Sequence, residues 1–174
     1  GYDDITASSP MMDTYRDVAR FVVKNSTAFS DATIKSSTKF VYVKYFRAMI
    51  KTVDAAADKA IAEYKSALAD ATGEDRKQAA YNAFLIGAAT GANSAIDAAM
   101  TDESLPDTLK SDIKNMAKNY VGQILLAATG KTTEAEALAE LKTMLEAKDS
   151  TSATFDAEVK AMISAKTLFN ITEQ

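Results

Sequence analysis

The chain has 174 residues, of which 33 are alanine, 6 are glycine and 2 are proline, and this composition predicts a single all-α domain over residues 1–174. It contains no cysteine and no histidine, which excludes disulfides, thiolate zinc sites, thiol nucleophiles and serine–histidine triads. The 20 basic and 24 acidic residues are well mixed, so no surface for nucleic acid is expected. We therefore predict a protein that is not an enzyme and that has no cofactor, metal or small-molecule substrate.

The first helical pattern begins at Ser9-Pro10, where Ser9 suits the N-cap and Pro10 the first helical position. Further along, apolar residues recur in alternating steps of three and four, which is a heptad seam. The seam consists of Val43, Phe46, Ile50, Val53, Ala57, Ala60, Tyr64, Ala67 and Ala71. Carried backwards, its register allows one helix over 11–71. The alternative, which we favour, is two helices with a break inside 25–38, because Asn25 begins a glycosylation sequon and a glycan cannot point into a core.

The segment "FVYVKYF", residues 40–46, favours a β-strand in isolation. The unbroken seam that starts at Val43 favours a helix there instead. The seam ends at Ala71-Thr72-Gly73, where Gly73 suits the left-handed position just past a helix. The next helix is predicted over about 75–101.

The helix predicted over 75–101 contains "LIGAATGANSA", residues 85–95, inside a 19-residue stretch without any charged residue, 78–96. Polar residues interrupt the stretch too often for a membrane span. Two neighbouring apolar stripes run along it and predict a helix buried among several neighbours. The stripes are Tyr81, Phe84, Ala88, Gly91, Ala95 and Ala98, and beside them Leu85, Ala89, Ala92, Ile96 and Ala99.

Gly91 lies on the first stripe, four residues after Gly87. A glycine inside a helix costs about 1 kcal/mol relative to alanine, so this position needs a physical reason. We predict that Gly91 lets the backbone of a neighbouring helix approach closely. A kink near Gly91 and a niche for a small ligand are the alternatives.

Pro106 marks the next boundary, and a helix is predicted over about 107–129 that ends at Gly130. Thr133 and Glu136 form a capping box for a further helix, a loop follows at 148–154, and a last helix begins at Phe155. The predicted core positions of these three helices are Leu109, Ile113, Met116, Tyr120, Ile124 and Ala127, then Leu138, Leu141 and Leu145, then Phe155, Val159, Met162 and Phe169. The sequence thus predicts an elongated antiparallel helical bundle with long heptad-patterned helices.

Two groups of residues are candidate sites. Asp54 and Asp58 lie one helical turn apart and could hold a divalent cation, but Lys51 and Lys59 lie near them, and we interpret the group as a solvated charged face. The aromatic residues Phe40, Tyr42, Tyr45 and Phe46 could line an apolar ligand pocket. We favour a core role for them, and "KYFR", residues 44–47, is interpreted as a helix surface with two core residues.

Two sequons, Asn25-Ser26-Thr27 and Asn170-Ile171-Thr172, are candidate N-glycosylation sites. The chain begins at Gly1 and not at methionine, which we interpret as processing or excision. Together these features predict an extracellular protein.

In "TVDAAADKAIAEYKSALADATG" (52–73) and "KTTEAEALAELKTMLEAKDSTSA" (131–153) the chain resembles the helical surface-coat proteins of African trypanosomes, in the style of their glutamic acid/alanine-rich protein. The resemblance implies a structural or shielding protein of a cell-surface coat, with neighbouring coat molecules as partners. It also implies attachment to the membrane through a lipid (GPI) anchor beyond Gln174. The rival hypothesis is an extracellular carrier of apolar ligands, which would be compact and enclose a cavity of a few hundred Å³.

Overall fold

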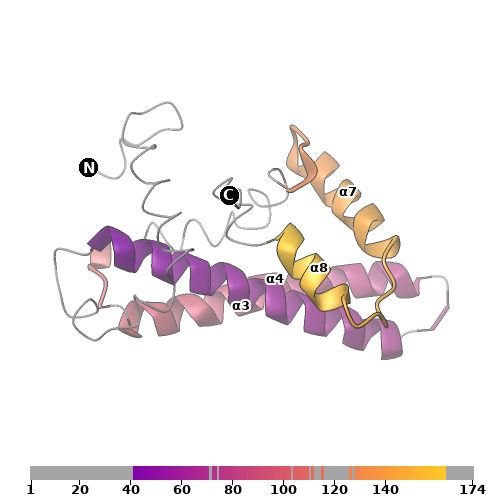
Figure 1. Cartoon of the computed structure of the whole chain (residues 1–174), viewed down its shortest axis with the longest axis horizontal. Helices are drawn as coiled ribbons and strands as arrows, with labels where there is room; N and C mark the ends of the chain where they lie inside the picture. Colours follow the sequence, from indigo (N-terminus) through magenta and orange to yellow (C-terminus); the bar gives the residue numbers. More distant parts are fainter. Residues whose placement is uncertain are drawn as a thin grey trace.

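The computed structural model describes residues 41–70, 72–73, 75–102, 104–109, 111, 115, 126 and 128–163. Of these residues 82% are helical and none lies in a strand, so the predicted all-α bundle is confirmed. The main helices in the described part of the chain are α3 (Val41–Asp70), α4 (Arg76–Asp102), α7 (Glu134–Glu146) and α8 (Phe155–Met162) (Figure 1). From Val41 onward the β-prone segment is helical, as the seam predicts. The choice between one helix and two over 11–40 lies outside the described residues.

α3 and α4 form an antiparallel hairpin in which the two helices lie side by side along most of their lengths (Figure 1). With 30 residues, α3 is about 45 Å long at 1.5 Å per residue. Gly73 has a φ of 91° in the turn, and its carbonyl oxygen accepts a hydrogen bond of 3.3 Å from the Arg76 N–H. The predicted helix end at Gly73 and the start of the next helix near residue 75 are both confirmed.

Small residues fill the α3–α4 interface, and Ala56, Ala57 and Ala60 are fully buried there. A Cβ atom built on Gly91 would lie 2.5 Å from the carbonyl oxygen of Ala55, and one built on Gly87 would lie 2.8 Å from that of Lys59. Both glycines therefore face the α3 backbone, where a side chain has no room. The predicted close approach at Gly91 is confirmed, and α4 continues through it without a break.

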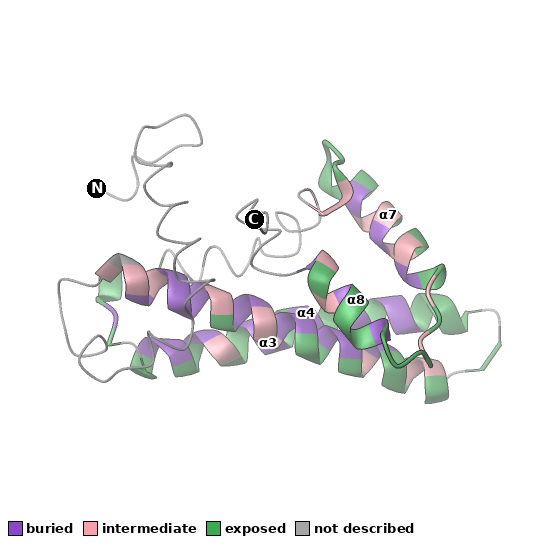
Figure 2. Cartoon of the chain, in the orientation of Figure 1, coloured by how far each residue is buried: buried purple, intermediate pink, exposed green. Residues whose placement is uncertain are grey.

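The largest part of the core lies where α7 and α8 cover one end of the hairpin (Figure 2). Tyr64 of α3 stacks on Phe155 of α8, with ring centroids 5.9 Å apart, and meets the edge of Phe84 of α4 at 6.2 Å. Leu141 and Leu145 of α7 complete this cluster. A second cluster near the other end of the hairpin consists of Ala48, Ile96, Ala99, Met100, Leu105 and Leu109.

The expectation that α4 is buried on several sides is wrong. Only one face of α4 is buried, while Ile86 on the opposite face is 68% exposed and the predicted stripe residue Ala98 is also exposed. Near the start of α4 the buried face follows the first predicted stripe, as at Tyr81. Near the end of α4 it follows the second stripe, as at Ile96. A heptad stripe drifts by about 20° per repeat on a straight α-helix, and this drift explains why the first stripe leaves the interface.

On α3 the seam is largely confirmed, since Phe46, Val53 and Tyr64 are buried. Ile50 is only half-buried and packs against the edge of the core. The interpretation of residues 44–47 as mainly surface is wrong, because both cations in it are buried: Lys44 is 3% exposed and Arg47 6%. At these exposures the charged ends of both side chains are buried together with their aliphatic stems, which a count of charges does not predict.

The boundaries of the later helices follow the predicted caps. The N–H of Gly130, at a φ of 68°, donates to the Leu126 carbonyl at 3.0 Å, and Thr133 Oγ1 accepts from the Glu136 N–H at 3.2 Å to cap α7. Residues 148–154 connect α7 to α8, and Phe155 starts α8 as expected. Of the other predicted core positions Leu109, Leu141, Leu145 and Val159 are buried and Leu138 and Met162 half-buried, while Ile113, Met116, Tyr120, Ile124, Ala127 and Phe169 lie outside the described residues.

Candidate functional site

A groove of about 470 Å³ lies between α3 and α8 and opens to solvent. Its lining comprises Asp58, Ile61, Ala62, Lys65, Asp156, Ala157 and Lys160. Four of these seven side chains carry charge, with both signs present, and Ile61 is the one large apolar side chain among them. The groove therefore combines charged side chains with apolar surface and is open to solvent.

Asp58, half of the candidate cation site, forms an ion pair across the groove. Its Oδ1 atom lies 2.9 Å from Nζ of Lys160 on α8, and this hydrogen bond raises the pKa of Lys160. Burial raises the pKa of Asp54, an effect that Lys160 opposes and Asp58 reinforces. The neighbours named from sequence pair elsewhere: Lys51 contacts Asp102 on α4 at 2.6 Å, and Lys59 contacts Glu63 at 2.9 Å. The two aspartates are thus part of the α3–α8 contact as well as of a charged face.

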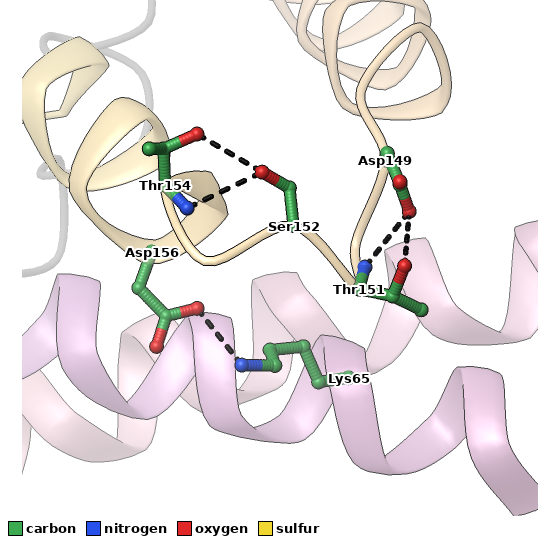
Figure 3. A network of polar contacts seen from close by, with 6 residues as sticks. All are labelled: Lys65, Asp149, Thr151, Ser152, Thr154 and Asp156. Carbon is green, nitrogen blue, oxygen red and sulfur yellow. Dashed lines mark hydrogen bonds and ion pairs between the residues drawn. The ribbon is translucent and has the colours of Figure 1, made fainter.

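Lys65 and Asp156 form the second ion pair across the groove, with Nζ and Oδ1 3.0 Å apart (Figure 3). Asp156 lies in the first turn of α8, where the helix dipole also favours a negative charge. These partners are 91 positions apart in sequence, and no local pattern predicts their contact. A third pair, Lys148 with Glu158 at 3.5 Å, connects the preceding loop to α8.

The loop before α8 is held by its own side chains (Figure 3). Oδ1 of Asp149 accepts hydrogen bonds from the Thr151 hydroxyl at 2.6 Å and from the Thr151 N–H at 2.9 Å, and these bonds lower the pKa of Asp149. The Ser152 hydroxyl accepts from the Thr154 N–H at 3.3 Å. This network shapes the connection into α8, which is a structural role.

The aromatic residues predicted to be core are only partly described. Phe46 is buried and meets the ring of Tyr45 edge to face at 5.2 Å. Phe40 and the side chain of Tyr42 lie outside the described residues. The described members pack as core residues, as expected.

The groove offers little chemistry of its own. Its charged side chains face one another in pairs, so an ionic ligand would have to displace an existing partner. Across the described part of the chain, no three acidic side chains come together as metal ligands.

The helices that the structure describes also lack any apolar stretch long enough to cross a bilayer. Both sequon residues, Asn25 and Asn170, lie outside the described residues.

Comparison of the chain with protein-family models, with curated proteins and with solved structures gave no match.

Proposed function

We propose that this chain is a non-enzymatic structural protein of a cell-surface coat. The observation that carries the proposal is the α3–α4 interface, where alanines and two glycines bring the helix backbones into contact and leave no space for a ligand. A long hairpin filled in this way is suited to a rigid spacer. The predicted sequons and the resemblance to trypanosome coat proteins support an extracellular location and a lipid anchor beyond Gln174.

The rival function, a carrier of apolar ligands, fits the described residues less well. A carrier requires an enclosed, mainly apolar cavity. The groove between α3 and α8 is open to solvent, and four of its seven lining residues are charged. Tyr64, Phe84 and Phe155, which could surround an apolar ligand, are packed on one another.

Localisation on intact cells tests the proposal. An antibody against the chain should label unpermeabilised cells, and a phosphatidylinositol-specific phospholipase should release the protein into the medium. Treatment with an N-glycosidase should lower its mass, and Asn25→Gln and Asn170→Gln should each remove one part of that shift. Labelling that requires permeabilised cells would contradict the proposal. Saturable binding of a fluorescent fatty acid, with retention in the soluble fraction, would favour the carrier instead.

A further inference from the structure

The outward side of α4 is an exposed surface without charge, which we name the outer α4 face. It consists of Ala79, Asn82, Ile86, Ala89, Thr90, Asn93 and Ser94, all of them exposed. Ile86 at its centre is 68% exposed, and it is the one exposed large hydrophobic side chain found among the described residues. Exposed charges are frequent elsewhere on the described helices, so the outer α4 face differs from its surroundings.

Two of the four polar side chains of this face, those of Asn82 and Thr90, have hydrogen-bond partners inside α4. Nε2 of Gln78 donates to Oδ1 of Asn82 at 3.0 Å, and the Thr90 hydroxyl donates to the Ile86 carbonyl at 2.9 Å. Polar groups that keep their hydrogen bonds lose less when a surface is removed from water. Alanine and other short side chains also allow a second helix to come close. The outer α4 face can therefore be buried at low cost.

Charges of opposite sign stand at the two ends of the face. At the start of α4 the exposed residues Asp75, Arg76 and Lys77 carry a net positive charge, and Asp97 is exposed just beyond Ser94. The midpoint of positions 76 and 97 is 86.5, which lies at Ile86. If a second copy of α4 lies antiparallel on the first, Arg76 of each copy comes next to Asp97 of the other, and the two Ile86 side chains meet near the two-fold axis. A parallel arrangement would instead place like charges together.

We propose that the outer α4 face binds a second copy of this chain in an antiparallel, two-fold symmetric dimer. One patch then meets itself, as symmetric dimers require. The antiparallel arrangement also aligns the two helix dipoles favourably. Because each chain carries a net charge of −4, copies should meet through a face that has no uncompensated charge. The proposal accounts for the lack of charge on a side of α4 that one chain leaves open, and it does not depend on a role in a coat.

Engineered cysteines test the register, since the chain has no cysteine of its own. Ile86→Cys should form an intermolecular disulfide under mild oxidation, because two residues at the axis come within the roughly 4–7 Å between Cα atoms that a disulfide needs. Ala98→Cys, exposed on the same helix, is the control. Its two copies would be about 35 Å apart at 1.5 Å per residue, so it should stay monomeric on a non-reducing gel. Equal cross-linking of both variants would overturn the proposed register.

Sedimentation equilibrium of the full chain tests the dimer itself. Ile86→Glu should raise the dissociation constant by more than about tenfold. Arg76→Asp and Asp97→Arg should each weaken association, and the double variant should restore it. Circular dichroism should show all variants folded. A wild-type chain that is monomeric at a few hundred micromolar, or a double variant weaker than both single variants, would refute the proposal.

Discussion

The α3–α4 hairpin and the α7–α8 segment belong to one bundle, but different contacts hold them. In the hairpin, small side chains let two backbones touch, as at Gly91 and Ala55. α7 and α8 attach through a few large side chains, chiefly Leu141, Leu145 and Phe155. Ion pairs with exposed side chains then surround the contact between α3 and α8.

The two kinds of contact should fail in opposite ways. An interface of alanine and glycine has little volume to lose, but an added methyl group has no place in it. A contact made by a phenylalanine and two leucines depends on volume, so removing atoms should release it. The hairpin is therefore expected to be sensitive to larger residues, and the α7–α8 segment to smaller ones.

The largest effect should come from the aromatic anchor of α8. Phe155 is 1% exposed and stacks on Tyr64, and Phe155→Ala should lower the free energy of unfolding by about 3–5 kcal/mol. Denaturant melts measure this loss. Hydrogen exchange should show that α8 loses protection before the hairpin does. Phe155→Leu keeps most of the volume and should cost less. Equal loss of protection in α4 and α8 would show that the two regions unfold as one unit.

The hairpin should respond to added volume at Gly91. Gly91→Ala should lower the free energy of unfolding by up to about 2 kcal/mol, since overpacking costs about 1–3 kcal/mol and the gain in helix propensity offsets roughly 1 kcal/mol of that cost. Gly91→Leu should cost more. Ser94→Ala, exposed one turn away on the same helix, should instead stabilise the protein slightly. A Gly91→Ala protein with a higher denaturant midpoint than the wild type would contradict backbone contact at this position.

Sequence patterns predicted the parts of the fold that local chemistry determines. Gly73 and Gly130 both adopt a positive φ past a helix, and Thr133 caps α7, because each depends only on neighbouring residues. Gly91 was also predicted correctly, since an unfavourable residue inside a long apolar pattern requires close packing.

Contacts between distant segments could not be predicted in the same way. Lys65 and Asp156 sit at exposed helical positions, where any opposite charge would fit the pattern equally well. The exposed side of α4 was missed because its apolar composition resembles that of a buried helix. The burial of Lys44 was missed because the charge of a lysine suggests exposure, whereas the whole Lys44 side chain is buried.

A hydrogen bond between α4 and α7 also joins the two regions, and alkaline pH should weaken it. The Tyr81 hydroxyl of α4 donates to the Leu138 carbonyl of α7 at 2.7 Å, and Tyr81→Phe should cost about 0.5–1.5 kcal/mol. Burial raises the pKa of Tyr81 to about 12 from an ordinary value of 10.0. The unfolded chain therefore loses this proton at lower pH than the folded protein does, and the free energy of unfolding should fall as the pH rises through this interval.

Tyr81→Phe should reduce that alkaline slope without abolishing it, because burial also raises the pKa of Tyr64. Melts at several pH values between neutral and strongly alkaline measure the slope. A slope identical in wild type and Tyr81→Phe would mean that the Tyr81 hydroxyl titrates as in the unfolded chain.

The smallest effect should come from the ion pair between Lys65 and Asp156, whose side chains are 43% and 61% exposed. Exposed pairs contribute under about 1 kcal/mol, because water and salt screen them and two flexible side chains lose freedom. Asp156→Ala alone overstates the pair, since Asp156 also interacts favourably with the N-terminal end of the α8 dipole. A double-mutant cycle with Lys65→Ala and Asp156→Ala removes that contribution, because it is the same with and without Lys65. The coupling energy should be positive at low salt and approach zero near 1 M salt. A coupling above about 2 kcal/mol that persists in salt would place this ion pair among the main contacts that hold α8. The α7–α8 segment would then not be held chiefly by apolar anchors, and its contrast with a hairpin held by backbone contact would need revision.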